Sequence, residues 1–165
     1  MPKLIIIRGN SGSGKTTLAK NLQHRFGRNT MVISQDIVRR EILWVEDKPK
    51  NGAVDLMVDL LSYGAEHCEI VILEGILYSD IYNPLFEAAV DIFKKDIYAY
   101  YYDLPFKETL VRHATKSNRF SFGEKEMRRW WREKDYIGFI KEKNITSDFS
   151  IDEAAEWVYA DALNI

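Results

Sequence analysis

The chain has 165 residues, of which 46% are apolar and 29% charged, and its formal net charge is −2. A chain of this length buries about 70% of its unfolded surface around one core, so residues 1–165 are expected to form one domain. The small negative charge argues against a protein that coats nucleic acid, and no apolar run approaches the roughly 18 residues that span a bilayer. Because the N-terminus has no signal-peptide pattern, a cytoplasmic protein without a membrane partner is expected.

Residues 4–18, LIIIRGNSGSGKTTL, are expected to form a strand, a phosphate-binding loop and the start of a helix. The pattern G-x-x-x-x-G-K-[ST] is filled by Gly9, Gly14, Lys15 and Thr16. In this pattern backbone N–H groups surround a phosphate, the lysine adds charge at the β- and γ-phosphates, and the hydroxyl is a ligand for Mg²⁺. The predicted nucleotide-binding residues are Gly9, Asn10, Ser11, Gly12, Ser13, Gly14, Lys15, Thr16 and Thr17.

Hydrophobic periodicity predicts the other elements of the chain. Further helices are expected at residues 37–45, 54–67, 84–93, 106–116, 124–132 and 151–163. Further strands are expected at residues 31–33, 69–73 and 97–102, with a short fifth strand at 145–146. Since helices separate the strands, the sequence predicts an α/β fold: three layers, with a parallel sheet of about five strands flanked by helices.

The carboxyl ends of the predicted strands carry the phosphate loop and the carboxylates Asp36, Glu74 and Asp103. In a parallel sheet ligands lie beyond those ends, so the loop and two or three carboxylates are expected at one crevice. Glu74 is expected to orient Mg²⁺ through water or to bind a substrate hydroxyl, and its alternative is a solvated strand end.

Asp36 is predicted to be a general base that accepts the proton of a substrate hydroxyl, or to hold the water shell of the metal. Its alternative role is to cap the helix that begins at Ile37. Arg39 and Arg40 are expected to clamp an anionic substrate, and Arg39 is favoured because its spacing from Asp36 places both on one helical face. Alternatively, Arg39 and Arg40 form the polar face of that helix together with Glu41.

Residues 107–134 contain nine Lys or Arg and four Glu, which gives a local charge of +5. This stretch is expected to form a short basic lid at about residues 112–132 that handles an anion. One or two of its arginines are expected to touch the nucleotide and the rest to lie on a solvated surface. Trp130 and Trp131 are adjacent, so packing is favoured for them over a place at the substrate crevice.

The loop at residues 9–16, SQD at 34–36 and LEG at 73–75 together resemble the small P-loop kinases. The runs 32–36 and 72–77 are similar to those of the uridine kinases, although Ile37 and Val38 stand where that family has aromatic residues. The run Asp36-Ile37-Val38-Arg39 is similar to the D-x-x-R of the polynucleotide 5′-kinases, which form a group with zeta toxins and chloramphenicol phosphotransferases.

The resemblance implies Mg²⁺-dependent transfer of the γ-phosphate of ATP to a hydroxyl of a small molecule. Two motifs favour a nucleoside acceptor, and a nucleic-acid end is less favoured. Arg112 is implied to lie against the adenine and Arg119 to reach the transferred phosphate. The implied catalytic residues are Lys15, Asp36 and Arg119, the substrate-binding residues Asp36, Arg39 and Glu74, and the metal ligands Thr16, Asp36 and Glu74. The alternative of another class is a regulatory protein that binds ATP or GTP without acting as a kinase.

Overall fold

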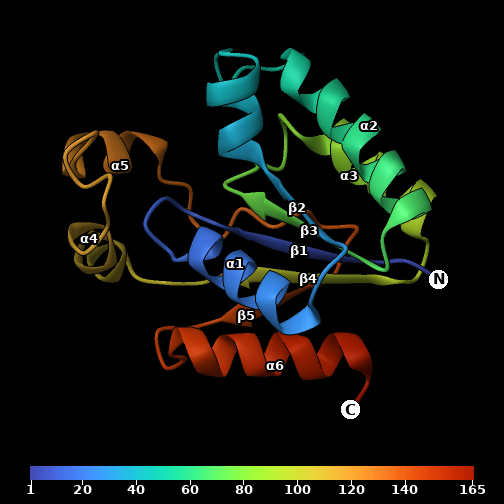
Figure 1. Cartoon of the computed structure of the whole chain (residues 1–165). Coiled ribbons are helices and arrows are strands. Elements are labelled where there is room, and N and C mark those ends of the chain that lie inside the picture. The colour runs from blue at the N-terminus through green and yellow to red at the C-terminus, as the bar shows by residue number, and fades with distance from the viewer.

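The centre of the molecule is a five-stranded parallel sheet with the order β2-β3-β1-β4-β5. A computed structural model describes residues 1–165 (Figure 1). The strands are β1 (Lys3–Gly9), β2 (Thr30–Ser34), β3 (Ile70–Gly75), β4 (Ile97–Tyr102) and β5 (Glu142–Ile145). The helices are α1 (Lys15–Phe26), η1 (Ile37–Ile42), α2 (Gly52–His67), α3 (Asn83–Phe93), α4 (Phe106–Ala114), α5 (Glu124–Trp130) and α6 (Ile151–Leu163). The predicted three-layer α/β fold is confirmed.

Two apolar clusters fill the space between the sheet and the helices on its two faces. Leu4 and Ile6 of β1 pack with buried residues of α2 and α3, whereas Ile5 and Ile7 pack with α1 and α6. Side chains of a strand alternate between the faces of a sheet, so a central strand covered by helices on both sides is apolar throughout. The run Leu4 to Ile7 is therefore fully buried.

The pairing of the strands brings the polar strand ends together. Ile7 of β1 lies opposite Glu74 of β3, and Glu74 lies opposite Ser34 of β2. On the other side of β1, Gly9 lies opposite Tyr102 of β4. The end of β1 where the phosphate loop starts is thus flanked by β3 and β4, which is where ligands bind in such sheets.

The helix predicted at residues 37–45 is wrong in type and in length. η1 is a π-helix that ends at Ile42, and the Leu43 N–H donates to the Val38 carbonyl five residues earlier. The fifth strand occupies residues 142–145 and not 145–146. This edge strand reads Glu-Lys-Asn-Ile, which carries no apolar alternation, and its pairing with β4 defines it. α4 and α5 each end two residues earlier than expected.

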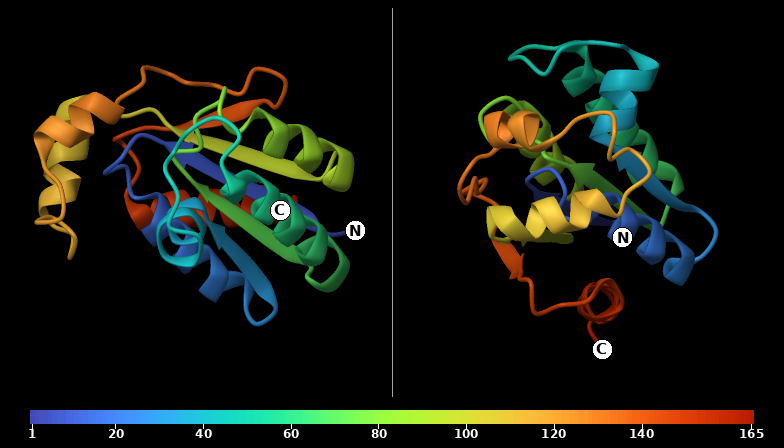
Figure 2. Two further views of the ribbon diagram at one scale, coloured as in Figure 1. Left: turned by 90° about the horizontal axis from the view of Figure 1, so that it is seen from above. Right: turned by 90° about the vertical axis from the view of Figure 1, so that its left-hand side faces the viewer.

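The region expected to be a lid comprises the end of α4, residues 115–123 and α5. It projects beyond the carboxyl end of the sheet, on the side of the molecule away from the N-terminus (Figure 2). None of the helices combines the length and the hydropathy that a membrane span requires.

Candidate active site

Residues 9–14 carry the chain from β1 to α1 and approach two other elements closely. Gly9, Gly12 and Gly14 have φ values of +145°, +81° and +103°. A Cβ on Gly9 would lie 2.8 Å from Tyr102 Cβ, and a Cβ on Gly12 would lie 2.6 Å from the Thr109 carbonyl oxygen. Gly9 and Gly12 are therefore needed for the contacts of the loop with β4 and α4, and the positive φ of Gly14 disfavours a side chain there.

Lys15 is buried at the start of α1, and its Nζ donates to the Asn10 carbonyl oxygen at 2.8 Å. Burial lowers the pKa of Lys15 to about 8, and the negative charge of Glu74 opposes this effect. The negative charge of a bound phosphate would favour the protonated amine and raise this pKa. The loop, the helix start and the lysine are thus arranged as an anion site.

Glu74 is 2% exposed at the end of β3, so it is not a solvated strand end. Its Oε1 accepts hydrogen bonds from Ser34 Oγ at 2.6 Å and from Thr16 Oγ1 at 3.2 Å. No group of three or more His, Cys, Asp or Glu side chains that would hold a metal by itself is present. The adjacent hydroxyl and carboxylate oxygens suit Mg²⁺ that also binds phosphate oxygens and water.

Asp36 lies between the phosphate loop and η1, and its side chain is 63% exposed. Asp36 Oδ1 is 3.7 Å from Arg39 Nη2 and 3.5 Å from Arg40 Nε. Its carboxylate makes no capping hydrogen bond with η1, so the capping alternative receives no support.

A narrow cleft, here called the transfer cleft, separates the phosphate loop from the lid. It is lined by Ser11, Gly12, Lys15, Thr16, Asp36, Glu74, Gly75, Ile76, His113, Lys116, Asn118 and Phe122. Of the residues predicted to be catalytic, Lys15 and Asp36 line this cleft. Arg119 does not, because its exposed guanidinium donates to the Lys116 carbonyl and lies over the Phe120 ring.

Lys116 is a cleft residue that the sequence reasoning missed. Its amino group makes no hydrogen bond or ion pair with the protein, and burial lowers its pKa against the attraction of Glu74. The available signal was its spacing, since Lys116 follows Arg112 by four residues, about one helical turn. The lid thus presents an unpaired cation to the transfer cleft.

A second cavity of about 710 Å³ lies beside the phosphate loop. It is lined by Gly14, Thr16, Thr17, Lys20, Arg112, Thr115, Lys116, Ser117, Asn118, Phe149, Ser150 and Ile151. Arg112 Nη1 donates to the Ser13 carbonyl oxygen at 2.8 Å, and its guanidinium lies 5.9 Å from the centre of the Tyr102 ring. The buried Tyr102 hydroxyl has no partner. Arg112 therefore presents a cation at the wall of this cavity, next to the start of α1.

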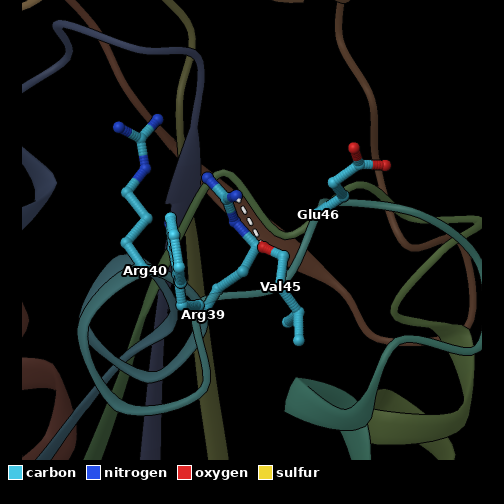
Figure 3. A pocket seen from close by; sticks show the side chains of 5 residues that line it. Arg39, Arg40, Val45 and Glu46 are labelled. Carbon is cyan, nitrogen blue, oxygen red and sulfur yellow. Dashed lines mark hydrogen bonds between the residues drawn. The ribbon is translucent and has the colours of Figure 1, made fainter.

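A third cavity of about 580 Å³, here called the acceptor pocket, opens on the other side of Asp36. It is lined by Ser11, Gln35, Asp36, Arg39, Arg40, Glu46, Asp47, Lys48, Ile76, Tyr78, Phe122, Arg129 and Trp130. The two adjacent tryptophans have different surroundings: Trp130 lines this pocket, whereas Trp131 packs edge-on against Phe106. Arg39 and Arg40 also line a neighbouring cavity of about 610 Å³, together with Trp44, Val45 and Glu46, which Figure 3 shows.

The fold and the phosphate-loop pattern are those of P-loop nucleotide-binding proteins. A family model described as an AAA domain matches residues 4–73, from β1 into β3. No curated protein sequence matches the chain.

Within this class the chain has the fold of the small P-loop kinases. The gluconokinase of Sinorhizobium meliloti superposes with a TM-score of 0.72 at 14% identity, over 99% of this chain and 93% of that one. The APS kinase of Mycobacterium tuberculosis, solved with AMPPNP and APS, gives 0.63 at 19% identity, over 99% and 98%. The shikimate kinase of Acinetobacter baumannii, solved with shikimate, gives 0.62 at 16% identity, over 99% and 94%.

Proposed function

We propose that the protein is a kinase that transfers the γ-phosphoryl group of ATP to a hydroxyl of a small molecule. The observation that carries this proposal is the arrangement of the transfer cleft, where Lys15, Asp36 and Lys116 converge between a nucleotide-sized cavity and the acceptor pocket. Phosphoryl transfer requires mainly positioning and positive charge around the γ-phosphate, and these residues supply both.

In the proposed reaction Asp36 accepts the proton of the acceptor hydroxyl. The acceptor oxygen forms a bond to the γ-phosphorus while the bond from that phosphorus to the β,γ-bridging oxygen breaks, and ADP leaves. Lys15 stabilises the charge on the β- and γ-phosphates, and Lys116 faces the transferred group from the lid. Thr16 and Glu74 would hold Mg²⁺, which supplies further charge neutralisation. Arg112 would contact the base of the nucleotide.

Transfer from radiolabelled ATP to a panel of nucleosides, phosphorylated nucleosides, sugars and sugar acids tests the proposal. Asp36→Asn keeps the shape of the side chain but removes the proton acceptor, so transfer should fall by about 10² to 10⁴ while ATP affinity changes little. Lys15→Ala should lower both ATP affinity and transfer, because it removes a central positive charge. Slow hydrolysis without transfer to any acceptor would favour a regulatory NTPase instead.

The sequence resemblances support two kinds of acceptor. The runs 32–36 and 72–77 favour a nucleoside, whereas the Asp36 to Arg39 run favours an acceptor with a phosphate near its hydroxyl, as in the polynucleotide kinases. The two hypotheses about the acceptor assume the same ATP site and the same role for Asp36. They differ in whether the acceptor presents a phosphate to Arg39 and Arg40 of η1.

A further inference from the structure

The ionic groups of the acceptor pocket do not balance. Its cationic side chains are Arg39, Arg40, Lys48 and Arg129, and its anionic side chains are Asp36, Glu46 and Asp47. Glu46 pairs with Lys48, and Asp47 accepts a hydrogen bond from the Tyr82 hydroxyl at 2.6 Å. Neither Glu46 nor Asp47 forms an ion pair with an arginine of the pocket. Of the three carboxylates, only that of Asp36 contacts arginines of the pocket, and it contacts Arg39 and Arg40 but not Arg129.

Arg39 is the least satisfied of these groups. Its side chain is only 14% exposed, yet its buried Nε–H has no hydrogen-bond partner. The guanidinium has five N–H donors and makes one hydrogen bond, from Nη1 to the Val45 carbonyl oxygen at 3.2 Å. The dashed line in Figure 3 marks this bond. Nε itself is closed off from solvent, so a ligand in the pocket would accept from the Nη groups, which make only this one hydrogen bond.

Arg40 and Arg129 line the pocket from two different helices, η1 and α5. The guanidinium of Arg40, from η1, and that of Arg129, from α5, each lie 5.9 Å from the centre of the Trp130 ring. Arg129 has no ion pair, and Arg40 has only the long contact of 3.5 Å with Asp36. The lid and η1 therefore add positive charge to the same pocket.

We propose that the acceptor carries an anionic group, such as a phosphate, sulfate or carboxylate, and that Arg39 and Arg40 bind it. This inference rests on the proposed kinase function. Since both guanidiniums lie within 3.7 Å of Asp36 Oδ1, the anionic group must sit close to the hydroxyl that reacts. The anion then replaces Asp36 as the partner of the two arginines, which leaves the carboxylate free to accept the hydroxyl proton. A neutral nucleoside offers no such group.

Anion binding is tested first, with inorganic sulfate as the probe. Saturation with Mg²⁺ and AMPPNP occupies the phosphate loop, so that sulfate titrated by calorimetry reports on the remaining anion site. Arg39→Ala and Arg40→Ala should each weaken sulfate binding by about tenfold or more, because charge-assisted hydrogen bonds are lost. Arg128→Ala is the matched control, since Arg128 is exposed on α5 and pairs with Glu124. Equal sulfate binding by all three variants and the unsubstituted protein would overturn the inference.

Acceptor use is tested second, with pairs that differ only in their anionic group. Suitable pairs are adenosine with adenosine 3′-phosphate, uridine with uridine 3′-phosphate, and sorbitol with gluconate. The anionic member of the pair that is used should have a kcat/KM about 10 to 100 times higher, and Arg39→Ala should abolish this preference without changing AMPPNP affinity.

The outcomes separate this inference from the proposed function. Equal use of neutral and anionic acceptors would overturn the inference and leave the kinase function standing. Sulfate binding that depends on Arg39 and Arg40, without transfer to any acceptor, would support the anion site and count against the kinase function.

Discussion

Lys15 and Lys116 reach the transfer cleft from the phosphate loop and from the lid, and burial lowers the pKa of both amino groups. Lys15 already donates to the Asn10 carbonyl, whereas the Lys116 amino group has no protein partner. We therefore expect Lys15 to contribute to nucleotide binding and Lys116 mainly to phosphoryl transfer. The two lysines give two separate predictions.

The first prediction concerns the pH dependence of ATP binding. The pKa of Lys15 is lowered to about 8 in the free protein, and bound phosphates favour the charged amine and raise it. Binding then takes up a proton above pH 8, so Mg²⁺-ATP should bind about tenfold more weakly at pH 9 than at pH 7. Calorimetry in buffers of different ionisation enthalpy measures both the affinity and the proton uptake.

Lys15→Arg is the control for this effect, because a guanidinium stays charged across the whole range. The variant should lose most of the pH dependence, whatever its affinity at pH 7. A dependence of unchanged size in Lys15→Arg would assign the titration to another group and contradict the prediction.

The second prediction compares Lys116 with Arg119. Lys116→Met removes the unpaired cation that faces the transferred group, so kcat should fall by about 10² while the KM for ATP changes by less than about threefold. Arg119→Met removes a cation held on the lid surface and should leave kcat within about twofold. Steady-state kinetics of both variants decides which lid cation acts. The reverse order of effects would restore the role that the family resemblance implies for Arg119.

At the scale of elements, β1 and η1 show what local sequence can and cannot predict. β1 was predicted because its apolar run is followed by the phosphate-loop pattern. η1 was expected to be an ordinary helix, since periodicity does not distinguish a short π-helix from an α-helix. Its wider turn and the bond from Val45 N–H to the Arg39 carbonyl decide how the arginines face the acceptor pocket.

The third prediction concerns the contact between the phosphate loop and α4. In Gly12→Ala the new Cβ would lie 2.6 Å from the Thr109 carbonyl oxygen, at a φ of +81°. The variant should lose about 2–4 kcal/mol of unfolding free energy and bind ATP at least tenfold more weakly, because either α4 or the loop must move. Chemical denaturation and nucleotide titration measure the two effects.

Gly27→Ala is the matched control, because Gly27 has a φ of +95° and nothing within 4 Å of an added Cβ. It carries the backbone strain without the collision and should cost about 1–2 kcal/mol with unchanged ATP affinity. If the two variants behave alike, the close approach of α4 does not explain Gly12.

For the molecule as a whole, sequence reasoning predicted what depends on local pattern and on strand order. The phosphate loop, Asp36 and Glu74 meet at one edge because parallel strands end together. Lys116 was missed and packing was favoured for Trp130, because the positions of both depend on how the lid folds back over the sheet. The same holds for Arg8, a charged residue within an apolar strand that no local pattern explains.

Arg8 joins parts of the chain that are distant in sequence. Its side chain is fully buried, with Nη1 2.7 Å from Glu142 Oε1 and Nη2 3.0 Å from Asp135 Oδ2. Nε and Nη2 also donate to the Leu77 carbonyl at 3.1 and 2.9 Å. Asp135 in turn accepts from the Ser79 N–H and hydroxyl. The central strand is thereby tied to the edge strand, to the segment after the lid and to the segment after β3.

The fourth prediction concerns this network. In Arg8→Met the buried Glu142 loses its partner, so the unfolding free energy at pH 7.5 should fall by about 3–5 kcal/mol in urea titrations. Burial already raises the pKa of Glu142, and losing Arg8 raises it further. At pH values above the pKa of Glu142 in the unfolded chain, the folded variant therefore binds more protons than the unfolded chain does. Its unfolding free energy should therefore decrease as the pH rises from about 5 to 8. Adding Glu142→Gln should flatten this slope and recover stability at pH 7.5, whereas a double variant that keeps the slope would show that the buried charge lies elsewhere.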